Sequence, residues 1–385
     1  MCPTIAYLAQ GKVRLKAGDA PPRTIESPYA NTIREREVRA QQRNSWKAQG
    51  GGFLSGPMLW GQRGAAQGPT PVMVTSISGS EDKKRLIYSL ESGSLCALLA
   101  TENFGDEERR LWNNNNFKLQ HVRACSRTGD LAFSTTHANG TANIGVMFKD
   151  ENSVKELTEG DSVDTSPQWV PGNPRKLVFQ SAGVGRNRQG HFLALGPFSI
   201  QELNLDTAEM TTLLEEAKTD YLAPQIAEDG TLYYIRRPYA PTESINPLRV
   251  VKDFFLFPFR LLFAVFQFLN FFSMSFTGKK LSTAGDTKAR ELDMRQMMIY
   301  GNIIRAQQDS NEDAPDLVPG SWQLVRRRDG GKEEVLARGV LAYDLAADGT
   351  IAYSNGNAIF VISPESKKER ILSERMIEQV VLLES

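Results

Sequence analysis

The chain has 385 residues, with 45 basic and 45 acidic side chains. This length holds one large β domain or two ordinary ones, and the balanced charge gives no global field for nucleic acid, so no nucleic-acid partner is expected. The cysteines Cys2, Cys96 and Cys125 are far apart and lack zinc-site spacing, which predicts no metal site and favours a reducing compartment. Cys96 and Cys125 fall in apolar strand patterns, so we expect both to be buried.

The N-terminal residues predict two strands, 4–8 and 12–15, that resemble the middle strands of a sheet lacking its inner strand. The first 20 residues lack a basic start followed by an apolar core, so no secretory signal is expected, and the sequence predicts a cytoplasmic protein.

Residues 29–70 interrupt the strand pattern. Residues 30–47 are polar and favour a helix, Gly50, Gly51 and Gly52 follow, and the stretch 53–60 is apolar. We expect a surface helix, a hinge and an apolar loop. Either this insertion covers the β domain or it serves as an arm that binds a partner.

A repeated unit follows, in which an apolar strand, a glycine turn and further strands recur. Gly129 and Gly172 are 43 residues apart, Gly172 and Gly230 are 58 apart, and Gly230 and Gly349 are 119 apart. The turns at these glycines require positive φ. A spacing of about 40–50 residues with four strands per unit is typical of a β-propeller, and the longest gap fits one unit plus an insertion. The copies that the pattern indicates are 72–98, 122–147, 164–214, 223–235 and 341–362.

The segment 164–183, DTSPQWVPGNPRKLVFQSAG, resembles the TolB-type, WD-like propeller repeat, which is similar to the N-terminal propellers of dipeptidyl-peptidase-like proteins. The match rests on Asp164, Pro167, Trp169, Pro171 and Gly172, although the family's Ser-Pro-Asp-Gly turn is here Val-Pro-Gly-Asn. Residues 223–226 and 228–230 also match the repeat. The resemblance covers about 60% of the chain and implies a fold rather than an activity.

The expected fold is therefore all-β, a six-bladed propeller with a helical, Phe-rich insertion in the fifth blade; a seventh blade within 50–70 is the alternative. The C-terminal strand 378–383 has no later partner, so we expect it to close the ring beside the N-terminal strands. The propeller then comprises residues 1–28, 71–239 and 319–385, and the insertions are 29–70 and 240–318.

Within the second insertion, residues 254–276 hold ten of the chain's 19 Phe. On a helical wheel the polar residues of 248–272 form one narrow stripe beside a broad aromatic face, which suits a helix lying in the headgroup layer. Pro258 and the short uncharged run 261–278 argue against a span. The residues expected to bind the membrane are Phe254, Phe255, Phe257, Phe259, Leu262, Phe263, Phe266, Phe268, Phe272, Lys279 and Lys280. A second helix is expected over 288–308.

No catalytic constellation, cofactor motif or metal-ligand spacing is recognisable, so no catalytic residue and no cofactor is predicted. Polar groups on the inner strands could line a central channel, and the candidates are His121, Asp164, His191 and Asp344. The alternative is that these side chains serve the fold.

The expected function is a non-catalytic propeller scaffold, peripheral on the cytoplasmic face of a membrane, whose partners are the lipid bilayer surface and an unidentified protein. Two alternatives stay open: a hydrolase or lyase centred on the channel, and a fixed subunit of an integral membrane complex. In the latter, the Phe-rich stretch would be buried against partner helices.

Overall fold

The structure of the chain is a computed structural model. It describes residues 3–49, 71–80, 84–102, 104, 105, 107–151, 153–240, 298, 299, 302, 303, 316–328 and 331–383. The chain divides into two compact units, of which the larger comprises Met1–Ala240 and Ile304–Ser385. This larger unit holds all the strands discussed below except one short pair.

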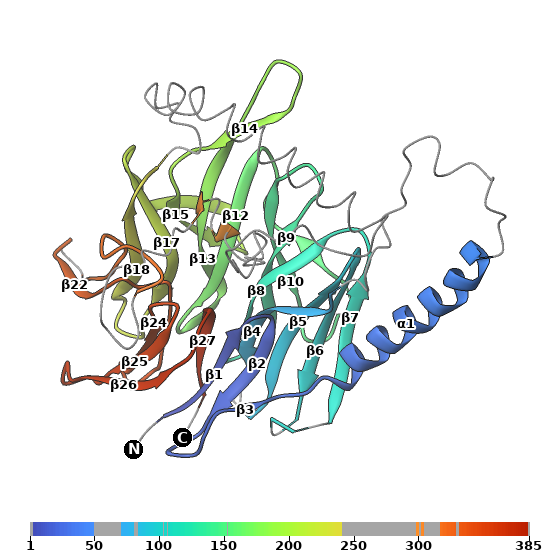
Figure 1. The fold of residues 1–385 in the computed structure, drawn as a ribbon. Coiled ribbons are helices and arrows are strands. Elements are labelled where there is room, and N and C mark those ends of the chain that lie inside the picture. Colours follow the sequence, from blue (N-terminus) through green and yellow to red (C-terminus); the bar gives the residue numbers. More distant parts are fainter. Residues whose placement is uncertain are drawn as a thin grey trace, which may run out of the picture. The chain divides into compact units, whose positions relative to one another are not determined.

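Most of the described chain is β structure, largely in antiparallel sheets of four strands (Figure 1). One sheet joins the two ends of the chain, in the order β27 (Ile377–Leu383), β1 (Thr4–Ala9), β2 (Lys12–Lys16) and β3 (Arg23–Thr24). The next sheet consists of β4 (Met73–Gly79), β5 (Leu86–Ser92), β6 (Leu95–Thr101) and β7 (Glu108–Asn114). The pairing of β27 with β1 is the arrangement that the apolar patterns at the chain's ends predict.

A nine-stranded sheet follows, and it contains two groups of strands. The first group is β8 (Lys118–Ala124), β9 (Leu131–Thr136), β10 (Ala142–Met147) and β11 (Lys155–Glu156). The second is β12 (Ser162–Val170), β13 (Asn173–Arg186), β14 (Phe192–Leu195), β15 (Ser199–Asn204) and β16 (Glu209–Leu214). A single parallel pairing, between Ala142 of β10 and Val163 of β12, connects the two groups.

Two further four-stranded sheets complete the larger unit within the described ranges. The first is β17 (Thr219–Ile226), β18 (Leu232–Pro238), β21 (Gln323–Arg327) and β22 (Glu333–Arg338). The second is β23 (Ala342–Leu345), β24 (Ile351–Ser354), β25 (Ala358–Ile362) and β26 (Lys368–Ser373). The long gap in the repeat, residues 239–322, therefore falls between two paired strands of one sheet, β18 and β21.

The core lies between the faces of consecutive sheets. Ile5 and Tyr7 of β1 pack in a cluster with Ala352 of β24, whereas Ala6 and Leu8 pack in another with residues of β4 and β5. Every residue of β1 after Thr4 is buried because alternate side chains enter different interfaces. This explains why these strands are continuously apolar rather than alternating.

The turn glycines confirm the conformation that the repeat requires. Gly129, Gly172, Gly230 and Gly349 have φ of 76°, 77°, 83° and 86°. A residue with a Cβ rarely adopts this left-handed conformation, and glycine adopts it without steric cost. Cys96 and Cys125 are free and buried, as the sequence predicts.

Helix α1 (Pro28–Gln49) is held to the β unit at its start. Ala30 and Ile33 are buried in the cluster formed with the N-terminal sheet and its neighbour. Tyr29 N–H donates to Glu108 of β7 at 2.8 Å. Most described side chains farther along the helix are exposed, and Val38 is among the exposed apolar ones.

The helix expected over residues 288–308 requires a correction. The pair β19 (Met298–Ile299) and β20 (Asn302–Ile303) is antiparallel, with Met298 opposite Ile303. The β-branched isoleucines favour strands, and the glycine at position 301 is a poor helix former. The rest of 241–315, including the Phe-rich stretch 254–276, lies outside the described residues.

Candidate functional site: the ring of inner strands

We call β4, β8, β12, β17, β23 and β27 the inner strands, one from each four-stranded sheet or strand group. Three of them share a bulge near their middle. In β8 the register shifts between Gln120 and Arg123, in β12 between Thr165 and Gln168, and in β17 between Leu222 and Gln225. Each bulge contains a non-glycine residue with positive φ, namely His121 (52°), Ser166 (54°) and Ala223 (50°). This backbone is costly for a residue with a Cβ, so its recurrence marks these bulges as a feature of the repeat.

Hydrogen bonds link consecutive inner strands, in one case through Gln180 of β13, whose side-chain amide also donates to Thr165 of β12. Val122 N–H of β8 donates to Ser76 Oγ of β4 at 2.7 Å. Trp169 of β12 donates its indole N–H to the carbonyl oxygen of Arg123 in β8 at 3.1 Å. Ala223 N–H of β17 donates to Gln180 Oε1 of β13, the strand paired with β12, at 2.6 Å.

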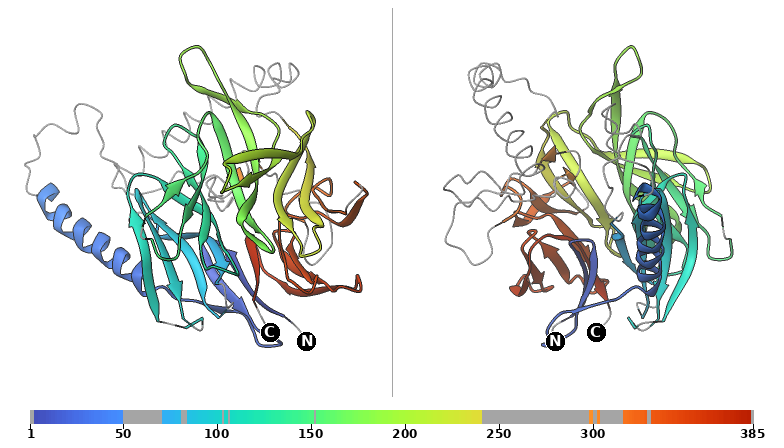
Figure 2. Two further views of the ribbon diagram at one scale, coloured as in Figure 1. Left: turned by 180° about the vertical axis from the view of Figure 1, so that it is seen from behind. Right: turned by 45° about the vertical axis from the view of Figure 1, so that its right-hand side comes forward.

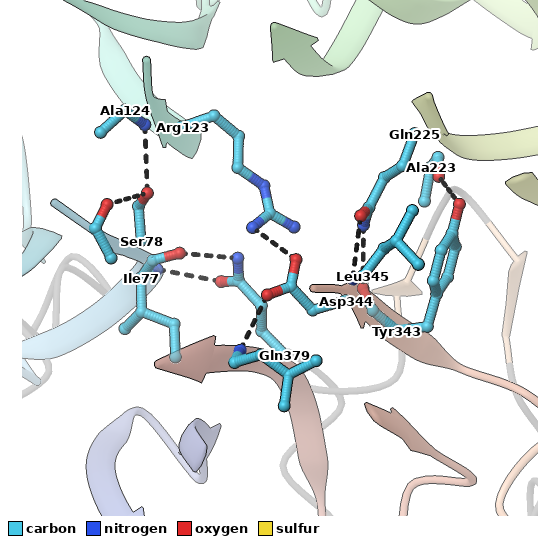
Figure 3. Close-up of polar contacts among 12 residues, drawn as sticks. Ile77, Ser78, Arg123, Ala124, Ala223, Gln225, Tyr343, Asp344, Leu345 and Gln379 are labelled. Carbon is cyan, nitrogen blue, oxygen red and sulfur yellow. Dashed lines mark hydrogen bonds and ion pairs between the residues drawn. The ribbon is translucent and has the colours of Figure 1, made fainter. Parts of the chain in front are cut away.

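The remaining links close the ring (Figure 3). Gln225 of β17 donates to Tyr343 O of β23 at 3.2 Å and accepts from Leu345 N–H at 3.1 Å. Leu382 N–H of β27 donates to Asp344 of β23 at 2.8 Å. The amide of Gln379 in β27 accepts from Ile77 N–H at 3.0 Å and donates to Ile77 O at 2.9 Å. The inner strands β4, β8, β12, β17, β23 and β27 thus form a closed ring of polar contacts.

An ion pair crosses this ring. Arg123 Nη1 of β8 lies 3.0 Å from Asp344 Oδ1 of β23, and the side chains are 17% and 10% exposed. The ring order places two inner strands between β8 and β23 on either side. The pair therefore connects opposite strands, and Figure 3 shows the extended Arg123 side chain reaching Asp344. Removing either partner would leave a largely buried charge uncompensated.

The sequence-predicted channel residues have different surroundings. Asp344 lies in the ring, and His121 is two residues before Arg123 on β8. Burial lowers the pKa of His121 to about 4, and the Arg123 charge acts in the same direction. His121 is thus neutral at pH 7, with Nδ1 at 2.8 Å from Ser134 Oγ. Asp164 is buried and accepts from Ser181 Oγ at 2.6 Å within its own sheet.

His191 does not join these residues. It is exposed in the turn that connects β13 and β14 (Phe192–Leu195), and its N–H donates to the side chain of Asn187 at 2.9 Å. The inner-strand candidates His121, Asp164 and Asp344 are engaged by hydroxyl, guanidinium or backbone partners. Such contacts fix the orientation of these side chains.

Glu378 is the inner-strand residue with the most perturbed carboxyl. It lies in β27, where the register with β1 shifts between Leu8 and Ala9. Its Oε1 is buried without a hydrogen-bond partner in the described part of the chain. Burial raises the pKa of Glu378 to about 7 because the charged form is deprived of water. Glu378 can therefore exchange a proton near neutral pH.

Sequence reasoning missed Arg123, Gln225, Gln379 and Glu378. The first two could have been found by aligning the copies. Val122-Arg123, Pro167-Gln168 and Pro224-Gln225 occupy the same two positions after the positive-φ residue of each bulge. Long polar side chains at one position of successive inner strands indicate that they point into shared space.

The candidates for membrane binding all lie outside the described residues. They are Phe254, Phe255, Phe257, Phe259, Leu262, Phe263, Phe266, Phe268, Phe272, Lys279 and Lys280. Among the described helical residues, none form a segment long and apolar enough to cross a bilayer. No group of three or more His, Cys, Asp or Glu side chains suited to a metal ion occurs in the same part of the chain.

Comparison with known proteins gives a structural likeness only. No protein-family model matches the sequence, and no curated protein matches it. The crystal structure of TolB from Acinetobacter baumannii superposes with a TM-score of 0.51 at 10% identity, covering 99% of this chain and 66% of that one. A nidogen/laminin complex superposes with a TM-score of 0.48 at 8% identity, covering 99% of this chain and 98% of that one. The tricorn protease superposes with a TM-score of 0.49 at 10% identity, covering 96% of this chain and 33% of that one.

The likeness to TolB confirms the resemblance that the Asp164–Trp169 motif indicates. The chain has a β-propeller fold built mainly from four-stranded antiparallel sheets. This chain spans just under two thirds of the TolB chain's length. At 10% identity the likeness shows the fold and carries no activity with it.

Proposed function

We propose that this chain is a non-catalytic, six-bladed propeller scaffold, held at the cytoplasmic face of a membrane, that presents its loops to a protein partner. One blade would correspond to each inner strand of the closed ring. With the blade that joins the chain ends counted as the first, the fifth blade would carry the insertion between β18 and β21. Propellers suit recognition because a stiff scaffold supports broad faces made of loops.

The observation that carries the scaffold proposal is the ion pair between Arg123 and Asp344. A catalytic centre on the axis would need polar groups available to a substrate. Here the two charged groups satisfy each other, and Asp344 also accepts from Leu382 N–H. The ring contacts of Gln225 and Gln379 are likewise made to backbone groups. This arrangement supports a rigid ring rather than a catalytic centre inside it.

The membrane part of the proposal rests on composition. The segment 254–276 is dense in Phe, with Lys279 and Lys280 shortly after it. So many neighbouring apolar side chains require cover by lipid or protein. Flanking cations favour an anionic lipid surface. We therefore propose that the segment lies in the headgroup layer as a peripheral anchor.

Liposome flotation tests the anchor. The full chain is compared with a variant in which residues 246–280 are replaced by a Gly/Ser linker, on anionic and on neutral vesicles. The expected result is that the full chain floats and the linker variant floats far less. If neither floats and the full chain alone self-associates, the segment is a protein interface, as for a fixed subunit of an integral membrane complex, and the proposal fails.

Glu378 favours a second candidate, an enzyme centred on the channel. Its pKa of about 7 suits a general acid or base at neutral pH. A hydrolase or lyase of this kind would lose turnover in Glu378→Gln without losing membrane attachment. Screening generic ester, peptide and glycoside substrates with the wild-type chain and this variant separates the two candidates, because a scaffold shows no turnover that depends on Glu378.

A further inference from the structure

A β-hairpin projects from the larger unit beyond the neighbouring strands. It consists of the second half of β13 and the short strand β14, with Val184 opposite Leu195 and Gly185 opposite Ala194. Figure 1 shows the hairpin labelled β14 at the top of the view, and Figure 2 shows the same projection from two other directions. The hairpin adds to the four strands of its group and is not needed to complete them.

Two exposed apolar side chains lie at the start of β14, next to the polar turn of this hairpin. Phe192 is 45% exposed and Leu193 is 54% exposed. Consecutive side chains of a strand point to opposite faces, so each face of the hairpin presents one of them. A flat partner docking on one face would leave the other residue in water. A medium that surrounds the tip, such as the interfacial layer of a bilayer, would cover both.

The turn of the hairpin carries an exposed cation, Arg188, beside Phe192. The hairpin segment 183–195 contains no acidic residue, and its other arginine, Arg186, is paired with Asp161. Cations beside an exposed aromatic and an aliphatic side chain are the combination that binds anionic headgroups.

The hairpin is also held in place before any partner arrives. Arg186 Nε lies 2.7 Å from Asp161 Oδ1, and the same guanidinium reaches the carbonyl oxygen of Asn139 at 3.3 Å in the neighbouring β9–β10 turn. The Asn187 side chain accepts from Gln189 N–H and His191 N–H, both at 2.9 Å. Because the turn is already ordered, insertion would cost little conformational entropy.

We propose that the β13–β14 hairpin is a second membrane-contact element, which inserts Phe192 and Leu193 among anionic lipid headgroups while Arg188 binds their phosphates. This inference rests on the proposed attachment to a membrane. It adds a contact independent of residues 246–280 and makes the tip of this hairpin face the bilayer.

The test uses the full chain and vesicles of phosphatidylglycerol with phosphatidylcholine, or of phosphatidylcholine alone. Phe192→Ser with Leu193→Ser is expected to weaken partitioning onto the mixed vesicles at least about tenfold. Arg188→Glu is expected to weaken it about fivefold or more on mixed vesicles only. Met210→Ser is the matched control, since Met210 on β16 is 58% exposed but lies outside the hairpin, and it should bind as the wild type does.

Unchanged melting temperatures show that the exposed substitutions leave the fold intact. If the double variant binds mixed vesicles as well as the wild type while the linker variant of 246–280 does not, the hairpin proposal is overturned and the anchor stands. If the wild-type chain binds neither kind of vesicle, the membrane attachment itself fails, and the hairpin proposal fails with it. A double variant that loses binding while the Met210 control retains it supports the hairpin.

Discussion

Glu378, on the inner strand β27, has a buried carboxyl whose protonation changes with pH near neutrality. Its Oε1 is buried without a hydrogen-bond partner in the described ranges, and burial raises its pKa to about 7. A carboxyl whose folded pKa is above its unfolded value binds its proton more tightly in the folded state. Its contribution to stability is therefore full at acid pH and declines as pH rises toward and through about 7.

We predict that Glu378→Gln stabilises the protein at pH 8 relative to the wild type, on the order of 2 kcal/mol, and leaves stability nearly unchanged near pH 4. Gln keeps the size of the side chain and cannot ionise. The measurement is urea unfolding of both proteins across this pH range. Glu369→Gln, at an exposed position of β26, is the control and should show no such trend. A constant difference between Glu378→Gln and wild type at all pH values would contradict the prediction.

At the scale of elements, α1 is attached to the β unit through its first residues. Ser27 Oγ accepts from Ala30 N–H at 3.1 Å, which is the geometry of an N-cap, and donates to Glu108 Oε1 at 2.6 Å. Glu108 also accepts from Tyr88 and from Tyr29 N–H. A single carboxylate on β7 thus joins the helix start to the second sheet.

We expect Ser27→Ala to destabilise the protein by about 1–2 kcal/mol, because both the cap and a hydrogen bond to a carboxylate are lost. Thr32→Ala is the control in the same helix, since the exposed Thr32 hydroxyl only donates to Pro28 O at 3.0 Å. Chemical denaturation of the two variants measures the difference. Equal stabilities would mean that the Ser27 cap and its hydrogen bond to Glu108 contribute nothing measurable.

Several elements could be predicted from the sequence because their signals are local. The glycine turns at 129, 172, 230 and 349 and the strands that follow them require only neighbouring residues. The polar composition of residues 30–47 predicts a helix, although Ser27-Pro28 is a start signal that places its beginning earlier. The extension of β13 to Arg186 was not predicted because Gly183 and Gly185 weaken the strand pattern there.

The candidate site could be predicted only in part, because its contacts join distant residues. Asp164 and Trp169 belong to a repeat motif, and the structure explains both: Asp164 binds Ser181, and Trp169 binds the backbone of the preceding inner strand. Arg123 and Asp344 are 221 residues apart in sequence. Their pairing depends on the order of the whole ring, which no local pattern contains.

At the scale of the whole molecule, the Arg123–Asp344 pair joins opposite inner strands. We predict that Arg123→Met costs about 3 kcal/mol, because the largely buried Asp344 loses its counter-charge. Arg123→Met combined with Asp344→Asn should cost less than the sum of the single variants. The measurement is a double-mutant cycle in denaturant.

The matched control for this cycle is Arg175→Met. Arg175 lies 2.8 Å from Asp206, but both side chains are well exposed, so its removal should change stability by at most about 1 kcal/mol. If Arg123→Met and Arg175→Met lower the free energy of unfolding by the same amount, the Arg123–Asp344 pair does not stabilise the ring. The scaffold proposal then loses the observation on which it rests.

The most direct measurement of the central proposal is the distribution of the protein between soluble and membrane fractions of cells that produce it. We predict that the full chain sediments with the cytoplasmic membrane and is released at alkaline pH, as a peripheral protein is, whereas the linker variant of residues 246–280 stays soluble. A full chain found only in the soluble fraction, or one that resists alkaline release and requires detergent, would contradict a peripheral scaffold.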